Sequence, residues 1–149
     1  MVKRGSGTDY IGVGVGAVIL NDRHELLLLR RKCEFDTGLW TIPGGGVEWF
    51  ETCVDAIKRE CREEVGVEIE VDRLLTVVDH IVRESGVHWV SLEYLVHITS
   101  GKAHNADKKE NHELRWFPLD ALPERLTQPS REAVQCILPA PLPARSLRS

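Results

Sequence analysis

Three glutamates, Glu60, Glu63 and Glu64, are spaced so that they share one face of a predicted helix. Like charges at these spacings destabilise a bare helix by about a few tenths of a kcal/mol per pair, so their concentration indicates an offsetting cation. Mg²⁺ takes oxygen ligands and typically combines a few carboxylates with waters and substrate phosphates. Glu51 lies in the first predicted turn of the same helix. The glycines just before it, Gly44 to Gly46, leave bare backbone that can approach a ligand closely.

A solvated acidic face is the alternative for these glutamates alone, because Arg59 and Arg62 could form ion pairs along the helix. The wider pattern favours a site. Glu51 follows Gly45 after five residues, and the run RECREEVGV begins at Arg59 after seven more. Residues 45–67 therefore resemble the Nudix box at every fixed position. The resemblance covers roughly residues 11–138, and it includes the approach to the box (39–45) and the segment 114–119.

The resemblance implies an enzyme that hydrolyses a diphosphate bond in a nucleoside diphosphate linked to another moiety, with Mg²⁺ as cofactor and Mn²⁺ as a possible substitute. It also implies the metal ligands: Glu60 and Glu64 at the centre, Glu63 in the same cluster, Glu51 directly or through water, and the carbonyl of Gly44. In this reading Arg59 orients Glu60 by a charge-assisted hydrogen bond rather than contacting substrate.

The general base is left open by the sequence. In the family it is a glutamate of the box or one on a later loop. Glu110 and Glu113 lie on a predicted polar loop just before Trp116, where such a residue is expected, and Glu110 is slightly favoured. A solvated loop charge is the alternative for either residue.

Substrate contacts are less well defined by the sequence. Arg30 and Arg31 follow a predicted strand and could meet phosphates, although a surface role is equally compatible. Trp40 and Trp49 flank the glycines and could stack on a base, with core packing as the alternative. Phe50 departs from the family, which usually has glycine before the first box glutamate. Its ring either reshapes the loop or forms a wall of the substrate pocket.

The substrate is inferred by elimination. No proline lies between Pro43 and Pro118, whereas relatives that cleave ADP-ribose usually carry one about 16 residues past the box. The tyrosine typical of dinucleoside-polyphosphate relatives and the upstream signature of coenzyme A relatives are also missing. By similarity to MutT-like proteins, we expect a (deoxy)nucleoside triphosphate that gives the monophosphate and pyrophosphate. A nucleotide-sugar (ADP-ribose-like) pyrophosphatase and a non-catalytic nucleotide sensor are the alternatives.

Composition bounds the remaining possibilities. The chain has 149 residues and a net charge of −4, with acidic and basic residues interspersed, which argues against nonspecific nucleic-acid binding. No apolar run approaches the ~20 residues of a membrane span. We therefore expect a cytoplasmic enzyme acting on a small nucleotide, with either a monomer or a homodimer compatible with the sequence. Four cysteines without CxxC spacing, Cys33, Cys53, Cys61 and Cys136, are interpreted as free thiols.

The helices and strands that position these residues are predicted from hydrophobic periodicity and from the residues that typically begin or end such elements. We expect strands at 10–20, 25–31, 39–42, 67–71, 74–83, 88–99 and 115–118. A helix is expected at 51–65 with an apolar stripe at Val54, Ile57, Cys61 and Val65, and a second helix at 130–138 with Ser130 as its N-cap. The predicted class is an α/β/α sandwich with a mixed sheet between helices. One domain at 10–138 lies between a flexible leader, 1–9, and a proline-rich tail, 139–149. Residues 12–17 match the GxGxxA pattern of a dinucleotide-binding loop. We reject that interpretation because no strand precedes the match.

Overall fold

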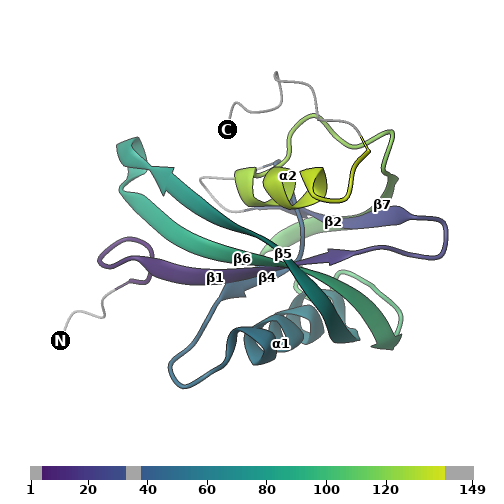
Figure 1. The fold of residues 1–149 in the computed structure, drawn as a ribbon, viewed down its shortest axis with the longest axis horizontal. Helices are drawn as coiled ribbons and strands as arrows, with labels where there is room; N and C mark the ends of the chain where they lie inside the picture. Colours follow the sequence, from purple (N-terminus) through teal and green to yellow (C-terminus); the bar gives the residue numbers. More distant parts are fainter. Residues whose placement is uncertain (1–4, 33–37, 140–149) are drawn as a thin grey trace.

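The computed structural model describes residues 5–32 and 38–139, which form two β-sheets with a helix on either side (Figure 1). The four-stranded sheet has the order β4-β1-β6-β5 and is mixed, because β1 pairs parallel with β6 while its other pairs are antiparallel. The three-stranded antiparallel sheet has the order β3-β2-β7. The strand bounds are β1 Gly12–Ile19, β2 Glu25–Arg31, β3 Trp40–Thr41, β4 Gly44–Gly46, β5 Glu68–Val82, β6 Val87–Ser100 and β7 Asn111–Pro118.

The helices α1 (Cys53–Val65) and α2 (Gln128–Gln135) lie on opposite sides of the sheets, and a short 3-10 helix, η1 (Arg83–Ser85), joins β5 to β6 (Figure 1). The expected sandwich with helices on both sides is confirmed. The sequence predicted one mixed sheet, whereas the structure divides the strands between two.

The four leucines of β2 pack toward both helices, one pair on each face of the strand. Side chains of a strand alternate between its faces, so Leu27 and Leu29 pack in the core cluster that contains Ile57 of α1. Leu26 and Leu28 belong to the cluster on the other face, together with residues of α2. All four leucines are fully buried, as an uninterrupted apolar strand between two covered faces requires.

Several element bounds differ from those predicted. The glycine run forms β4, and the two strands expected at 67–71 and 74–83 are one long strand, β5, with irregular register near Val71 and Leu74. Strand β7 begins at Asn111, four residues earlier than expected, because it pairs along the whole of β2. Helix α2 begins at Gln128 with Thr127 at its N-cap, so the prediction of Ser130 as N-cap is wrong. The Ser130 hydroxyl instead accepts a hydrogen bond from the Ile42 N–H at 2.9 Å.

The segment before β1 is attached to the sheet from Gly5 onward. The Gly7 carbonyl accepts a hydrogen bond from the His88 N–H at 2.8 Å, and Gly7 lies against the Trp89 ring. Residues 1–4 of the expected leader and 140–149 of the expected tail lie outside the described residues, as does Cys33. Within the described chain, no helix has the length and apolar character needed to cross a membrane.

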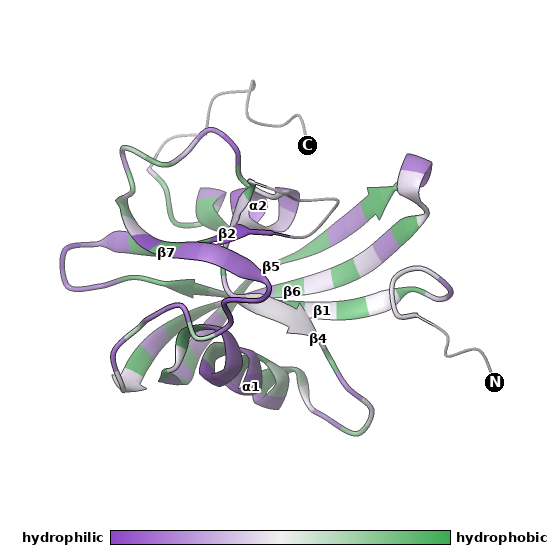
Figure 2. Ribbon diagram, turned by 180° about the vertical axis from the view of Figure 1, so that it is seen from behind, coloured by the Kyte–Doolittle hydropathy of each residue, from purple (hydrophilic) through white to green (hydrophobic). Residues whose placement is uncertain are grey.

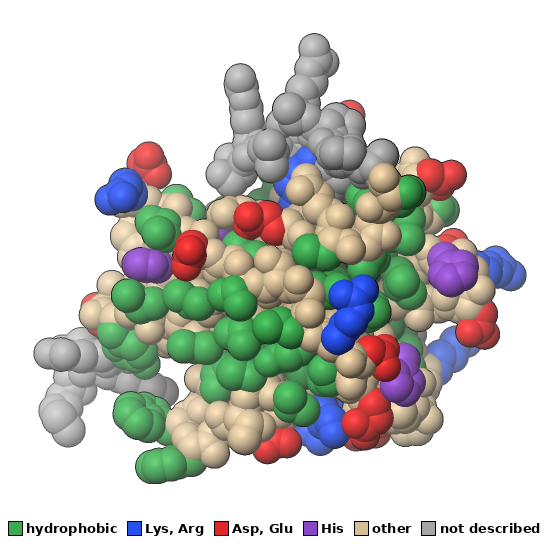
Figure 3. Space-filling view, viewed as in Figure 1, with side chains coloured by type: hydrophobic (Ala, Val, Ile, Leu, Met, Phe, Trp, Pro, Cys, Tyr) green, Lys and Arg blue, Asp and Glu red, His purple; other side chains and the backbone are tan. Residues whose placement is uncertain are grey.

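The exposed surface of the four-stranded sheet is unusually apolar along β5. Figure 3 shows hydrophobic side chains gathered across this face of the molecule, and Leu74, Val77 and Ile81 are among the large exposed hydrophobics. Helix α1 is amphipathic, and its ribbon alternates between hydrophilic and hydrophobic residues in Figure 2. Its hydrophilic residues include those of the candidate active site.

Candidate active site

Helix α1 is closed at both ends by its own residues. The Thr52 hydroxyl accepts a hydrogen bond from the Asp55 N–H at 3.0 Å, and Gly66 ends the helix in a left-handed conformation with φ 69°. The helix therefore begins at Cys53, and Glu51 lies in the turn before it. Its buried side contains Ile57, Cys61 and Val65 as predicted, but the expected member Val54 is exposed.

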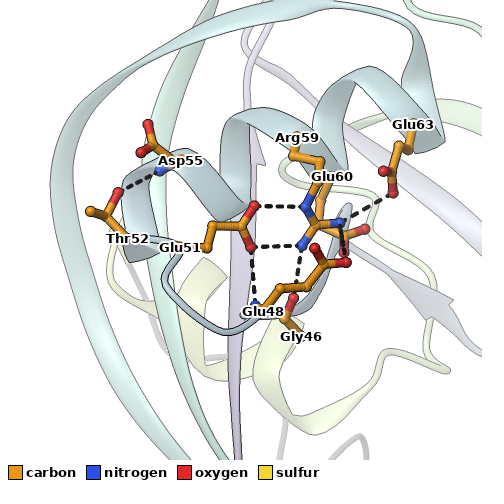
Figure 4. Close-up of polar contacts among 8 residues, drawn as sticks. All are labelled: Gly46, Glu48, Glu51, Thr52, Asp55, Arg59, Glu60 and Glu63. Carbon is orange, nitrogen blue, oxygen red and sulfur yellow. Dashed lines mark hydrogen bonds and ion pairs between the residues drawn. The ribbon is translucent and has the colours of Figure 1, made fainter.

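Arg59 connects the acidic residues on this side of the fold (Figure 4). Its Nε and Nη2 donate to the two oxygens of Glu51 at 2.8 and 3.0 Å. Its Nη1 donates to Glu60 Oε1 at 2.8 Å and to Glu63 Oε2 at 3.2 Å, and Nη2 also donates to the Gly46 carbonyl at 2.9 Å. One planar guanidinium thus fixes both the helix and the loop before it. The paired guanidinium lowers the pKa of the Glu51 carboxyl below its usual value.

Glu64 is the most deeply placed of the box glutamates, with 6% of its surface exposed. Its Oε1 accepts a hydrogen bond from the Gly44 N–H at 2.8 Å. Burial raises the pKa of the Glu64 carboxyl to about 8; the nearby Glu60 adds to the rise, while the Gly44 N–H and the charge of Arg31 oppose it. Burial likewise raises the pKa of Glu60, against the opposing effect of Arg59. Two buried carboxyls with raised pKa values are a place where a cation would be stabilised.

Strand β4 brings bare backbone against these carboxylates. A Cβ at Gly45 would collide with Glu60 Oε1, so a side chain there would displace the Glu60 carboxylate from the position in which Arg59 holds it. The glycine permits this close approach. The Gly44 backbone is already bonded to Glu64, so glycine strand and glutamate helix form a single unit.

The donor set fits a hard divalent ion. Glu51, Glu60, Glu63 and Glu64 offer carboxylate oxygens, and Gly44 adds a backbone carbonyl, which are the ligand types that Mg²⁺ prefers. Among the residues that the structure describes, no three acidic, histidine or cysteine side chains converge as a ready metal shell. The carboxylates are held instead by Arg59 and by the Gly44 N–H.

A cavity of about 250 Å³ lies beside β4. Its walls include the backbone of Gly44 to Gly46, the side chain of Arg31, and residues at the start of α2. The charge of Arg31 also reaches Glu64, so this arginine lies between the cavity and the acidic cluster. Of the predicted substrate contacts, Arg31 is the one whose position best suits a phosphate.

Glu93 is a residue of this cavity that the sequence analysis did not select. It lies on β6, where Trp89, Ser91 and Glu93 all line the cavity, and none of its side chain is exposed. Burial raises the pKa of the Glu93 carboxyl to about 7, while a hydrogen bond from Ser91 opposes the rise. A glutamate in the middle of a strongly apolar strand was the available signal.

The two candidates for the general base occupy different environments. Glu113 lies in β7 rather than in the predicted loop, and it pairs with Arg30 at 3.0 Å and with Arg115 at 3.0 Å. Glu110 lies in the loop before β7 and its side chain is exposed. The cross-strand pairing therefore engages Glu113 and Arg30 with each other, and Glu110 stays the stronger candidate for the base.

The predicted aromatic contacts lie in two environments: Trp40 is in the core, whereas Trp49 and Phe50 are exposed with ring centroids 5.9 Å apart. Trp40 is 9% exposed in the core cluster beneath α2, and its ring meets Phe117 edge-on at 4.8 Å between centroids. This packing does not favour its stacking on a base. Trp49 and Phe50 lie at the loop before α1, 87% and 101% exposed, where they border a shallow surface hollow that Glu60 also reaches. Phe50 adopts φ 65°, the left-handed conformation that glycine adopts without strain.

Two histidines are hydrogen-bonded to neighbouring side chains, and one cysteine is buried in the core. His80 is hydrogen-bonded to Gln128 at 2.9 Å and His97 to Asp72 at 2.8 Å. Cys61 is a buried thiol whose pKa burial raises to about 12, which keeps it uncharged and unreactive.

Comparison with known proteins places this geometry in a family. The model of the NUDIX domain matches residues 11–136. A MutT NUDIX hydrolase from Burkholderia pseudomallei, 40% identical, superimposes with a TM-score of 0.82 over 87% of this chain and 99% of its own. The chain therefore belongs to the Nudix hydrolase family.

Its curated relatives carry several activities. The human 8-oxo-dGDP phosphatase NUDT18 is 34% identical over 74% of this chain, and the chain spans 33% of that relative's length. The ADP-ribose pyrophosphatase of Methanocaldococcus jannaschii is 32% identical over 75% of this chain and 64% of its own length. A putative 8-oxo-dGTP diphosphatase of Bacillus subtilis is 31% identical over 77% of this chain and 75% of its own length.

Proposed function

We propose that this protein is a Mg²⁺-dependent pyrophosphohydrolase that converts a (deoxy)nucleoside triphosphate to the monophosphate and pyrophosphate. The observation that carries the proposal is the pair of the buried Glu64 and the partly buried Glu60, held against a bare glycine strand that also forms a wall of a cavity. A cation held by these carboxylates would meet the phosphates of a nucleotide whose base occupies the cavity.

Each side chain has a distinct role in this proposal. Glu60 and Glu64 hold Mg²⁺, with Glu51, Glu63 and the Gly44 carbonyl completing its shell. A divalent ion held by these residues would neutralise phosphate oxygens and acidify water at the site. Arg59 positions Glu51 and Glu60 through its fork of hydrogen bonds.

The remaining steps belong to residues on the sheets. Arg31 binds phosphate oxygens from the cavity side. Glu110 accepts the proton of the water that attacks phosphorus, and Arg31 offsets the charge of the departing pyrophosphate. Trp49 and Phe50 at the outer loop contact the substrate only at its exposed end.

Relatives support the triphosphate and also one second candidate. The match to the Bacillus subtilis relative, which is named putative 8-oxo-dGTP diphosphatase, covers three quarters of that relative's length. The archaeal ADP-ribose pyrophosphatase is similarly close in sequence, which makes a nucleotide sugar the second candidate. The human relative acts on a diphosphate according to its name, so diphosphates belong in any substrate panel.

The test is product analysis over a panel of (deoxy)nucleoside triphosphates, diphosphates and ADP-ribose with Mg²⁺. We expect equal amounts of monophosphate and pyrophosphate from at least one triphosphate, with Mn²⁺ supporting the same reaction. Glu64→Gln should abolish turnover, while Glu84→Gln, a matched change of an exposed glutamate on η1, should not alter it. Cleavage of ADP-ribose alone would select the second candidate. Nucleotide binding without turnover of any compound would select a sensor.

We also propose that the enzyme acts in the cytoplasm as the sequence predicts. A homodimer stays a prediction, which light scattering of the purified protein would test.

A further inference from the structure

Glu93 is a buried acid in which one of the two carboxyl oxygens receives a hydrogen bond and the other does not. Its Oε1 accepts a short hydrogen bond from the Ser91 hydroxyl. Its Oε2 has no hydrogen-bond partner among the residues that the structure describes. An unsatisfied buried carboxyl is costly, and a leucine of similar size would avoid that cost. A ligand with N–H donors could supply the hydrogen bonds that Oε2 does not receive from the described residues.

The free oxygen belongs to a wall of the cavity beside β4. Glu93 and Ser91 both contribute to that wall, and Oε2 lies directly over Gly16 of β1. A side chain at Gly16 would occupy the position of Oε2, so the glycine keeps this part of the cavity open. The Trp89 ring, packed on the glycines of β1, adds a flat apolar surface to the same wall.

Strand register fixes the relation of Glu93 to the acidic cluster. Glu93 pairs with Gly16, and Gly16 pairs with Gly44, whose N–H is bonded to Glu64. Two strand spacings, about 10 Å, therefore separate Glu93 from the strand that holds the glutamate helix. A nucleotide with its phosphates at Glu64 directs its base toward Glu93, because Gly44, which is bonded to Glu64, lines the same cavity as Glu93.

Among the residues that the structure describes, the charge that shifts the pKa of Glu93 comes from another acid. Glu132 of α2 is the nearby charge that acts on this carboxyl, and it raises the pKa of Glu93 further. His80 of β5, which also borders the cavity, is engaged with Gln128. With a pKa of about 7, the carboxyl is available as an acceptor near neutral pH, and N–H donors of a ligand would favour its ionised form.

We propose that Glu93 is a specificity residue that binds the base of the substrate by accepting hydrogen bonds from two adjacent N–H donors, which selects guanine-type nucleotides. This inference rests on the proposed function, because it assumes that the phosphates lie at the glutamate helix. Guanine, oxidised or not, presents N1–H beside an exocyclic N2 amino group. Adenine and cytosine present one donor beside an acceptor, and thymine presents one donor between two acceptors, so a carboxylate pairs fully with guanine alone.

Binding of nucleoside monophosphates tests the proposal without catalysis. We expect calorimetry to give a Kd for dGMP at least about tenfold lower than that for dAMP or dTMP, because a site built to accept hydrogen bonds discriminates against a ligand that lacks the donors. The Kd of dIMP, which lacks the N2 amino group, should lie between those of dGMP and dAMP. Equal binding of dGMP and dIMP would overturn the two-donor assignment.

Substitution of Glu93 gives the second arm. Glu93→Gln replaces one acceptor by a donor, so dGMP should bind about 10–100-fold more weakly while dAMP, which offers a donor beside an acceptor, binds more tightly. A merely structural role would weaken all ligands alike. Ser91→Ala frees Oε1 and should reduce the preference for dGMP by a smaller factor. If Glu93→Gln does not fold, as thermal unfolding would reveal, Ser91→Ala and the dGMP–dIMP comparison still decide the matter.

The outcomes separate this inference from the proposed function. Pyrophosphate release with unchanged base preference in Glu93→Gln would refute the role of Glu93 and leave the function standing. Selective dGMP binding that depends on Glu93, without turnover of any nucleotide, would instead refute the pyrophosphohydrolase and leave the base site.

Discussion

Glu64→Gln is the change that most directly tests the acidic cluster. The amide keeps the size of the side chain and can still accept the hydrogen bond from the Gly44 N–H. It removes the charge whose burial raises the pKa of Glu64 to about 8. The variant should therefore fold, bind no Mg²⁺ at this site, and lose nearly all turnover.

The size of the stability effect follows from the shifted pKa. A folded-state pKa of about 8 is above the usual 4.5, so the folded protein holds this proton more tightly than the unfolded chain. The resulting stabilisation is fully present below pH 4.5 and is lost as pH rises through 8. At about 1.4 kcal/mol per pKa unit, ionisation of Glu64 should lower the free energy of unfolding of the metal-free protein by on the order of 3 kcal/mol between about pH 5 and about pH 8. Glu60 titrates with it, because burial raises its pKa too.

The assay is thermal or urea unfolding in a chelator, for both proteins, over this pH range. For a domain of this size, about 3 kcal/mol corresponds to roughly 6–12 °C in Tm. Between about pH 5 and about pH 8, the Tm of the wild type should fall by this amount more than the Tm of Glu64→Gln. Near pH 5 the two Tm values should be nearly equal. Glu93, whose pKa of about 7 acts with the same sign, contributes equally to both proteins and cancels in the difference.

Mg²⁺ supplies the second measurement. At about pH 8 and 100 times its Kd, a ligand that binds only the folded state stabilises it by about 2.7 kcal/mol. The wild type should gain this and Glu64→Gln should not. Parallel pH curves for the two proteins, or equal stabilisation by Mg²⁺, would refute both the burial argument and the metal assignment.

Three further predictions concern the residues around the cluster. Arg59→Lys should lower kcat by about 10–100-fold at saturating Mg²⁺ with Tm little changed, because lysine cannot reproduce the planar fork that fixes Glu51 and Glu60; an unaltered kcat would remove its positioning role. Glu110→Gln should reduce kcat by about 10²–10⁴-fold if it is the base, whereas Glu113→Gln, which only breaks ion pairs with Arg30 and Arg115, should have a small effect; near-normal kcat in both would place the base within the box. Phe50→Gly should raise stability by roughly 0.5–1 kcal/mol in urea unfolding, since it relieves the left-handed strain at φ 65° and loses little packing from a fully exposed ring; Phe50→Ala, which keeps the strain, is the control and should not show this gain.

The sequence by itself determined the parts of this protein that depend on spacing along the chain. The glutamates of α1 and the glycines before them are close in sequence, so helical periodicity alone brings Glu60, Glu63 and Glu64 to one side. The run of β-forming residues at 25–31 likewise predicted the strand β2, and its burial on both faces came from the structure. Local patterns of this kind carry the fold class and the family.

Only the tertiary structure decided which of these charges are buried. Glu63 and Glu64 are neighbours in sequence, yet Glu64 is buried against β4 while Glu63 is exposed, because burial depends on what lies beside the helix. The pairing of Glu113 with Arg30 requires the register of β7 on β2. Glu93 became a candidate for the same reason, since strand pairing to Gly16 and the cover of α2 enclose it. Contacts between distant segments set solvent exposure, and solvent exposure sets the pKa and the hydrogen-bonding needs of each acid.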